Sequence, residues 1–319
     1  MEEFEVTIAV INYNTKEWLD ACLKSVTSVP PLAAHEIYVI DNGSTDGSAD
    51  FVHRHHPDVH LIENAGNLGF SAAANQALRT SHAKYVLILN TDTEVDPEAI
   101  DILVEFGDAN DQMGAAGPLL LNTDGTIQLS GRRFPSFLDA TMHAFLGIFW
   151  PENPFSVRYR MLDWDRQSER TVDWVSGAAM FIRREAARDV NFFDERFFMY
   201  VEDMDLCNRL WHKGWKVYFC PEARVIHHLA KSSEQSSVRM IIEFQRSLYR
   251  FYAKSYTRTR KVWLKPLVAV GLTLRAAILI ARAWIERKLA DRRETPVPIE
   301  GPESPDGWDG DDEREREVR

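Results

Sequence analysis

The chain has 319 residues, 45% of them hydrophobic, and a formal net charge of −11, which suits one large domain with an appendage. An acidic body does not suit nucleic acid, because phosphate contacts need clustered Lys and Arg, so we expect no nucleic-acid partner. The N-terminus lacks a basic region followed by an apolar run, and three cysteines without metal-ligand spacing indicate buried thiols in a reducing cytoplasm.

The charge is distributed unevenly along the chain. Residues 1–230 carry a net charge of −15, residues 231–290 carry +10, and residues 291–319 carry −6. We therefore predict a globular domain over 1–235, a basic helical extension over 236–290, and an acidic tail over 291–319. The tail is rich in proline and has almost no large apolar residues, so we expect it to be disordered.

Short apolar runs alternate with helix-like stretches over the first 120 residues. Val6–Ile11 is nearly all apolar and β-branched, as in a buried central strand. The same pattern predicts further strands at Glu36–Ile40, Val59–Ile62, Tyr85–Leu89 and Ala115–Leu121, and helices at Glu17–Val26, Ser48–His55, Ser71–Ser81 and Pro97–Phe106. Repeated β-α-β units predict an α/β fold with a mainly parallel sheet and helices on both faces.

The later segments have weaker patterns. Residues 122–170 hold many aromatic side chains and several prolines without a clear period, and we expect loops and short helices that cover a cleft. Thr171–Ile182 is strand-like, and residues 238–290 are expected to be helical.

Polar residues follow four successive predicted strands. The four clusters are Asn12-Tyr13-Asn14, Asp41–Asp46, Asn64–Phe70 and Asn90-Thr91-Asp92. Each cluster alone can be explained by the residues that a turn requires. Parallel sheets, however, bind ligands beyond the carboxyl ends of their strands, so four such clusters together indicate one binding crevice. Tyr13 and Asp41 suit a nucleotide base, and Asp92 suits a divalent metal. Neither a phosphate-loop motif nor G-x-G-x-x-G is present, which excludes a plain NTPase and an ordinary dinucleotide dehydrogenase.

Seven segments resemble those of the inverting family 2 glycosyltransferases, especially the rhamnosyltransferase-like branch. They are VINYN, IDNGSTDGS, NAGNLGFSAAANQAL, LILNTDTEVDP, WVSGAAMFIRREA, FDERFFMYVEDMDLCNRLWHKGWKVYFCP and VIHHLAKSS. The resemblance covers roughly residues 5–235 and implies a GT-A (Rossmann-like) domain before the helical extension. It also implies transfer of one sugar from a nucleotide-sugar donor, dTDP-rhamnose in that branch, to a glycan or polyprenyl-linked acceptor during cell-surface polysaccharide synthesis.

The resemblance further implies roles for individual residues. The nucleotide sugar would be bound by Asn12, Tyr13, Asn14, Asp41, Asn67, Gly69 and Asn90. Gly177 and Glu202 would contact the acceptor, and Asp203 matches the catalytic base, although an acid at a helix N-terminus is also favourable for the helix dipole. Asp92 matches the last carboxylate of the family's Asp-x-Asp motif, whose first position is here Asn90. With His227, or alternatively His228, Asp92 would hold Mg²⁺ or Mn²⁺.

That set of residues meets the demands of the chemistry. A sugar hydroxyl is a poor nucleophile, so a carboxylate must accept its proton as the new bond forms. The diphosphate leaves with growing negative charge, which a divalent cation offsets.

The basic extension contains a strongly apolar segment, Val262–Ile285. Lys265, Arg275 and Arg282 interrupt it, so it has no uncharged stretch of about 18 residues, as a simple membrane span would have. On a helical wheel these charges share one sector, which suits the interface of an anionic membrane. We therefore expect a cytoplasmic protein peripherally associated with the inner face of the cell membrane. A helix packed on the domain or in a homodimer is the alternative.

Three other functions are weighed against glycosyl transfer. A nucleotidyltransferase that makes a nucleotide sugar would need a Gly-rich basic loop where this chain has Asn12–Thr15. A processive polysaccharide synthase would need several membrane spans and a Gln-x-x-Arg-Trp motif, and neither is present. A non-catalytic sugar-binding protein would not need Asp41, Asp92 and Asp203 together.

Overall fold

The structure is a computed structural model that describes residues 4–228, 238–255 and 262–294. Of the tail expected to be disordered, 291–319, the first four residues are instead the end of a helix, and 295–319 lie outside the described residues. The strands are β1 (Val6–Asn12), β2 (His35–Asp41), β3 (His60–Glu63), β4 (Tyr85–Asn90), β5 (Thr93–Val95), β6 (Met113–Leu121), β7 (Gly131–Arg132), β8 (Arg170–Thr171), β9 (Trp174–Val175), β10 (Ala179–Arg183) and β11 (Lys216–His227). The helices are α1 (Lys16–Thr27), α2 (Ser48–His55), α3 (Phe70–Thr80), α4 (Ala99–Ala109), α5 (Phe137–Leu146), α6 (Pro154–Arg160), α7 (Arg184–Asp189), α8 (Glu202–Lys213), α9 (Val238–Ser255) and α10 (Lys265–Glu294).

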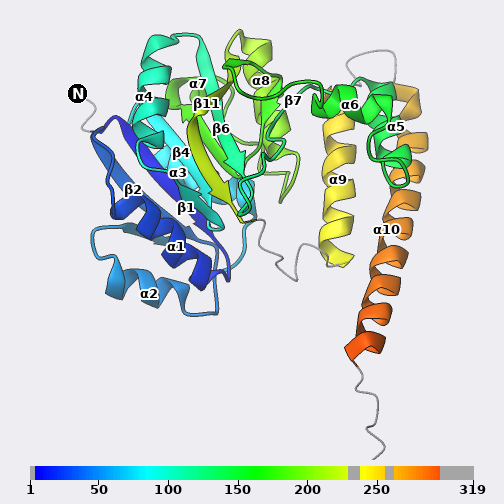
Figure 1. The fold of residues 1–319 in the computed structure, drawn as a ribbon, viewed down its shortest axis with the longest axis horizontal. Helices are drawn as coiled ribbons and strands as arrows, with labels where there is room; N and C mark the ends of the chain where they lie inside the picture. Colours follow the sequence, from blue (N-terminus) through cyan, green and yellow to red (C-terminus); the bar gives the residue numbers. More distant parts are fainter. Residues whose placement is uncertain (1–3, 229–237, 256–261, 295–319) are drawn as a thin grey trace, which may run out of the picture. The chain divides into compact units, whose positions relative to one another are not determined.

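Nine strands form one sheet in the described part of the chain, in the order β3-β2-β1-β4-β10-β6-β11-β5, with β8 paired to β11 (Figure 1). Strands β3, β2, β1 and β4 are parallel to one another, as are β6 and β11, whereas β10 runs antiparallel between β4 and β6. The predicted mainly parallel α/β sheet is confirmed. The antiparallel direction of β10 and the existence of β11 were not predicted.

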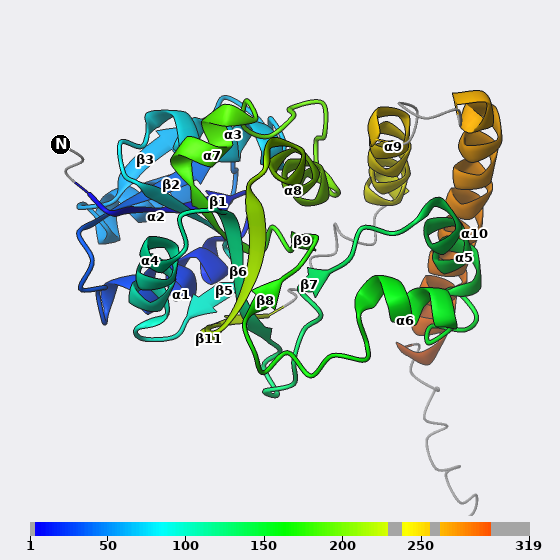
Figure 2. The same cartoon turned by 90° about the horizontal axis from the view of Figure 1, so that it is seen from above.

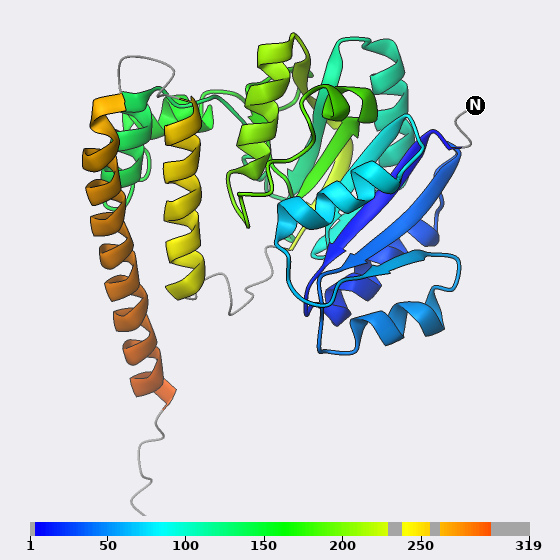
Figure 3. The same ribbon diagram turned by 180° about the vertical axis from the view of Figure 1, so that it is seen from behind.

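Helices cover both faces of the sheet, as Figure 2 shows. In β1, Val6, Ile8 and Val10 point to the core under α1, α2 and α4, while Ala9 and Ile11 point to the core under α3, α7 and α8. Helix α3, coloured cyan, lies in front of the sheet in Figure 3. Because both faces are covered, the central strands are apolar along their length rather than alternating with polar residues.

The strand register gathers the predicted polar clusters at one edge of the sheet. Asn12 lies opposite Asp41 in the β1–β2 pair, and Ile11 lies opposite Asn90 in the β1–β4 pair. At the far strand, β5 pairs antiparallel with β11, and Thr93 lies opposite His227. The register therefore brings His227 beside the residue that precedes β5, which is Asp92.

The segment over residues 122–170 forms β7, α5 and α6. Strand β7 pairs with β9, so Gly131 lies opposite Val175 and Arg132 opposite Trp174. The expected continuous strand over Thr171–Ile182 is instead broken into β8, β9 and β10. All three cysteines are buried free thiols, as predicted.

Helix α9 packs against the sheet domain through polar and apolar contacts. Ser247 Oγ donates a hydrogen bond to the carbonyl of Met199 at 3.0 Å, and Phe251 is buried in the core shared with α8. Lys254 Nζ forms ion pairs with Asp194 and Asp205 at 2.7 and 2.8 Å. These contacts attach α9 to α8 and to the loop before it.

Helix α10 begins in the first of two compact units, residues 1–280, and ends in the second, of which Ala281–Glu294 is described. Arg275 Nε donates to the Ala144 carbonyl at 2.9 Å and Arg275 Nη1 donates to Gln245 Oε1 at 3.0 Å. Arg275 is therefore partly buried among protein groups, whereas the helical wheel grouped it with Lys265 and Arg282 in one charged sector that suits a membrane interface. Large apolar side chains are exposed instead, among them Leu267, Val270, Leu274 and Ile278.

Candidate functional site

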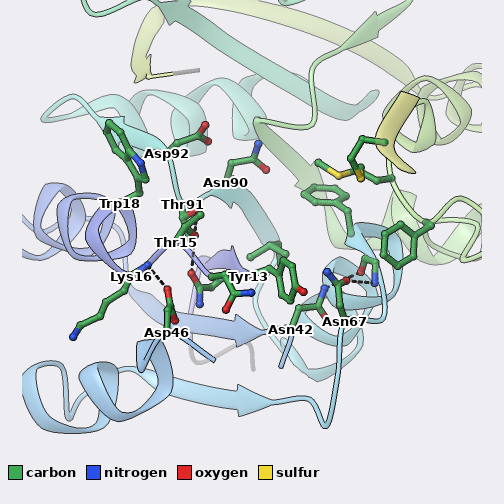
Figure 4. Close-up of a pocket in the computed structure, with 18 of the residues that line it drawn as sticks. Tyr13, Thr15, Lys16, Trp18, Asn42, Asp46, Asn67, Asn90, Thr91 and Asp92 are labelled. Carbon is green, nitrogen blue, oxygen red and sulfur yellow. Dashed lines mark hydrogen bonds between the residues drawn. The ribbon is translucent and has the colours of Figure 1, made fainter. Parts of the chain in front are cut away.

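A cavity of about 750 Å³ lies beyond the carboxyl ends of β1, β2 and β4, within the size range of small-molecule sites (Figure 4). All four polar clusters contribute to its wall, together with the loop before α8 and one residue of α9. The lining residues are Ile11–Trp18, Asn42, Asp46, Asn67, Gly69, Phe70, Asn90–Asp92, Phe198–Tyr200 and Met240. Residues 122–170 contribute nothing to this wall, contrary to the expectation that they cover the cleft.

The turn after β1 is held by a buried polar network. Asn12 Nδ2 donates to Asp41 Oδ1 at 2.6 Å, and the Ser44 backbone N–H donates to Asp41 Oδ2 at 2.9 Å. Asn14 has a left-handed φ of 52°, and its Oδ1 accepts a hydrogen bond from the Thr45 N–H at 2.7 Å. Asp41 is only 3% exposed and lies behind Asn12, so it positions the turn that forms the cavity wall.

Tyr13 lines the cavity close to Asn42, which was not predicted as a site residue (Figure 4). Asn42 Oδ1 accepts hydrogen bonds from the Asn64 side chain and the Leu68 N–H, and its Nδ2 donates to the Gly69 carbonyl. Asn42 thus fixes the loop that carries Asn67 and Gly69. Its position directly after Asp41, within the second polar cluster, was the signal that could have identified it.

Gly69 allows two loops to meet at the cavity. Its φ is +87°, and a Cβ there would stand 2.5 Å from the Phe198 carbonyl oxygen. The neighbouring Phe70 N–H donates to the same carbonyl at 2.8 Å. The backbone therefore requires glycine here for both conformation and space.

We expect Gly69→Ala to lower the free energy of unfolding by about 2 kcal/mol or more, because it adds a backbone clash to an unfavourable φ. Thermal or urea unfolding would measure the loss. Gly47 provides the matched control, since its φ is +82° but a Cβ there would meet nothing within 4 Å. Gly47→Ala should lower the free energy of unfolding by about 1 kcal/mol, because it has the unfavourable φ without the backbone clash. Equal losses in the two variants would contradict the clash.

Asp92 and His227 face each other at one end of the site. His227 Nε2 lies 3.3 Å from Asp92 Oδ1. His227 Nδ1 lies 2.9 Å from Gln128 Oε1, and Gln128 Nε2 donates to the His227 carbonyl at 2.6 Å. Because Gln128 Oε1 can only accept, Nδ1 carries a proton, and Nε2 is the ring nitrogen that faces the carboxylate. An imidazole nitrogen and a carboxylate oxygen that face each other are a donor pair suited to a divalent metal.

The protein supplies few ligands for such an ion. Among the described residues, no group of three or more His, Cys, Asp or Glu side chains lies close enough together to hold a metal ion. Two protein ligands match a cation such as Mg²⁺, which keeps several waters and binds substrate phosphates. His228 is directed elsewhere, with Nε2 2.6 Å from Glu94 Oε1 and its ring 4.6 Å from Trp18. The geometry thus favours His227 over His228 as the ligand.

Asp203 is the second residue of α8, and the two residues before this helix have left-handed backbone. Tyr200 and Val201 have φ of +68° and +69°, and this conformation is costly for a β-branched residue such as Val201. Asp203 Oδ2 accepts from the Gly177 N–H at 3.0 Å, and its Oδ1 accepts from the Met204 N–H at 2.7 Å. Burial raises the pKa of Asp203, and the two N–H donors partly offset that rise.

Glu202 is more deeply buried than Asp203. It is 6% exposed, and its Oε2 has no hydrogen-bond partner among the described residues. Burial, and then the charge of Asp203, raise the pKa of Glu202 well above its ordinary value. Glu202 does not line the cavity, so its expected contact with an acceptor stays a prediction.

Gly177 links the Asp203 carboxylate to the cavity. A Cβ on Gly177 would stand 3.6 Å from Asp203 Cβ and 3.7 Å from the ring of Phe70, which lines the cavity. The Asn90 N–H donates to the Ala178 carbonyl at 2.9 Å and holds this turn against β4. Phe70 lines the cavity, whereas Gly177 and Asp203 do not. The Asp203 carboxylate therefore lies next to the cavity wall rather than in it.

Comparison with known proteins places these features in context. The family model described as Glycosyl transferase family 2 matches residues 7–190. The N-acetylglucosaminyl-diphospho-decaprenol L-rhamnosyltransferase of Mycobacterium tuberculosis is 32% identical over 284 residues, which span 86% of this chain and 92% of that protein. Rhamnosyltransferase WbbL of Escherichia coli is 28% identical over 186 residues, 57% of this chain and 67% of that protein.

A solved structure has the same fold at low sequence identity. The mannosyltransferase PcManGT from Pyrobaculum calidifontis, in complex with GDP-Man and Mn²⁺, superposes with a TM-score of 0.54 at 18% identity. The match covers 93% of this chain and 78% of that one.

Proposed function

This chain belongs to glycosyl transferase family 2 and is a glycosyltransferase, and from that premise we propose that it transfers a rhamnosyl group from dTDP-rhamnose to a sugar on a polyprenyl diphosphate. The rhamnosyl group and the acceptor are suggested by the Mycobacterium tuberculosis relative, whose name specifies L-rhamnosyl transfer to N-acetylglucosaminyl-diphospho-decaprenol. The nucleotide dTDP is the one that the resemblance to the rhamnosyltransferase-like branch implies. One observation in the structure carries the proposal. Asp92 lines the cavity beyond the parallel strands and lies 3.3 Å from His227. Asp203 accepts a hydrogen bond from Gly177, which lies next to Phe70 in the cavity wall.

The residues divide the reaction between them. Asn12, Tyr13 and Asn14 on the turn after β1 would bind the base and ribose, with Asp41 holding that turn in place. Asp92 and His227 would hold Mg²⁺ or Mn²⁺, and a bound cation offsets the charge of the leaving diphosphate.

Asp203 would act as the general base. Its carboxylate accepts the proton of the acceptor hydroxyl while that oxygen attacks the anomeric carbon, and the bond from that carbon to the diphosphate oxygen breaks. Attack from the face opposite the leaving group inverts the anomeric configuration. The N–H donors of Gly177 and Met204 orient the carboxylate.

A donor panel tests the substrate assignment. With Mg²⁺ or Mn²⁺ and a short isoprenyl-diphospho-N-acetylglucosamine acceptor, we expect dTDP-rhamnose to give a rhamnosylated product and dTDP. UDP-, GDP- and other dTDP-sugars should give at least about tenfold lower kcat/KM. If another donor in the panel gives a higher kcat/KM than dTDP-rhamnose, the assignment of rhamnose is wrong, but the proposal of glycosyl transfer still stands. Formation of a nucleotide sugar with release of pyrophosphate would instead point to a nucleotidyltransferase.

We also propose that α10 brings the enzyme to the cytoplasmic face of the membrane. The described residues contain one helical segment, Val262–Glu286, that is long enough and apolar enough to cross a membrane, judged by length and composition alone. Large apolar side chains on it are exposed, and residues 231–290 carry a net charge of +10. Exposed apolar area and basic charge together favour an anionic bilayer surface.

We expect Leu267→Ser with Leu274→Ser to reduce binding to anionic liposomes at least about tenfold, since each loses exposed apolar surface that would enter the bilayer. Liposome sedimentation would measure it, with Thr273→Ser on the same helix as the control. Transfer to a soluble acceptor should persist. Unchanged liposome binding together with a shift from dimer to monomer would show that a second copy of the chain covers this surface.

A further inference from the structure

The turn that precedes α8 has a strained backbone. Tyr200 and Val201 have left-handed φ of +68° and +69°, although neither is glycine. A conformation of this kind persists only where the surrounding structure holds it in place. Asp203 lies in the chain directly beyond this turn, as the second residue of α8. The conformation of the turn therefore decides where the Asp203 carboxylate lies.

Helix α9 contacts this turn through one of its sides. Ser247 is fully buried, and its Oγ donates a hydrogen bond to the Met199 carbonyl at 3.0 Å. The ring of Phe244 meets the ring of Tyr200 at an interplanar angle of 82°, with the ring centroids 5.4 Å apart. Met240, on the same helix, lines the cavity. The spacing of positions 240, 244 and 247 is that of one side of a helix.

The same turn forms part of the cavity wall. Phe198, Met199 and Tyr200 all line the cavity, together with Met240 of α9. The Phe70 N–H, at the start of α3, donates to the Phe198 carbonyl at 2.8 Å. Helix α3 therefore holds the first of these three residues, and α9 contacts the other two.

Helix α9 is attached to two other helices and so gives the turn a fixed support. Arg275 of α10 donates from Nη1 to Gln245 Oε1 at 3.0 Å, and its guanidinium lies 5.7 Å from the Phe244 ring. Near the other end of α9, Lys254 pairs with Asp205 of α8 at 2.8 Å. Phe244 thus projects from a helix that is held on both sides of the turn.

We propose that Phe244 is a positioning residue, whose ring holds Tyr200 and so places the Asp203 carboxylate against the acceptor hydroxyl. Ser247 serves the same purpose through the Met199 carbonyl. The proposal rests on the proposed role of Asp203 as the general base. It makes α9 a part of the active site, although the charge pattern of the sequence separated this helix from the catalytic domain.

The test compares Phe244→Leu, which removes the ring, with Phe244→Tyr, which keeps it. Phe137→Leu is the matched control, because Phe137 is also partly buried and its ring lies 5.7 Å from Tyr252, which is on α9 but does not contact the turn. Ser247→Ala removes the hydrogen bond to Met199 and is measured alongside. Kinetics with the preferred donor and an isoprenyl-diphospho-N-acetylglucosamine acceptor separate kcat from KM. Calorimetry measures dTDP binding, and thermal unfolding measures stability.

We expect Phe244→Leu and Ser247→Ala each to lower kcat by about tenfold or more, because a displaced base is no longer aligned with the hydroxyl. The KM for the acceptor and the affinity for dTDP should stay near those of wild type. Phe244→Tyr should keep the wild-type kcat. Phe137→Leu should lose about as much stability as Phe244→Leu and still keep the wild-type kcat.

Equal losses of kcat in Phe137→Leu and Phe244→Leu would overturn the proposal, since the effect would then follow stability alone. A kcat for Phe244→Tyr as low as that for Phe244→Leu would overturn it too. Asp203→Asn separates this inference from the one beneath it. If Asp203→Asn keeps near-native turnover, the assignment of the base is wrong and the positioning role is lost with it. If only Phe244→Leu and Ser247→Ala keep near-native turnover, the base stands and the positioning role is wrong.

Discussion

Replacing Asp203 with Asn is expected to lower kcat by about 10²–10⁴ while donor binding stays near that of wild type. The variant keeps the shape of the side chain but removes the group that accepts the proton of the acceptor hydroxyl. It also loses one acceptor for the N–H groups of Gly177 and Met204, at a cost of about 1 kcal/mol in stability. Steady-state kinetics at saturating substrates, with donor binding by calorimetry, measure the two effects.

The pH profile adds a second signature. A base works only when deprotonated, so wild-type kcat/KM should fall as pH falls through the pKa of Asp203, which burial raises from its ordinary value. This fall at low pH should be absent from the pH profile of the residual activity of Asp203→Asn.

Asp205, two residues along α8, provides the matched control. It is buried and paired with Arg209 and Lys254, so Asp205→Asn should lower stability and leave the reaction intact. Near-native turnover by Asp203→Asn would remove Asp203 from the role of base.

Replacing Asp92 with Ala is expected to lower metal-dependent kcat/KM by about 100-fold or more, because the site loses its one carboxylate ligand. Weaker binding of Mn²⁺ should appear directly in calorimetry with dTDP present. His227→Gln should raise the Mn²⁺ concentration needed for half-maximal activity by about tenfold or more.

Neighbouring residues supply the controls for the metal site. Glu94→Gln and His228→Asn alter the pair that lies next to the proposed ligands and is held together at 2.6 Å. Both variants should keep the wild-type requirement for Mn²⁺. Full activity of wild-type protein in a chelator, or equal effects of His227→Gln and His228→Asn, would contradict the assignment.

The sequence alone predicted the parallel half of the fold and the polar turns that line the cavity. Apolar β-branched runs and amphipathic stretches are local signals, and they identified β1 to β4 with their helices to within a few residues. Because residues at the ends of parallel strands must share one edge, the turns containing Asn12 and Asn90 could be assigned to one crevice from order alone. Gly69 was identified as a site residue, although its packing requirement against Phe198 was not visible in the sequence.

Only the tertiary structure decided the remaining features, since each depends on pairing between distant parts of the chain. The direction of β10 and the pairing of β5 with β11 follow from the assembled sheet, and that pairing distinguishes His227 from its neighbour His228. The helical wheel of α10 could not reveal that Arg275 turns toward Ala144 and Gln245. Local periodicity specifies which face of an element is apolar, whereas the partner of each side chain is set by contacts between distant segments, such as Arg275 and Ala144, which are 131 residues apart.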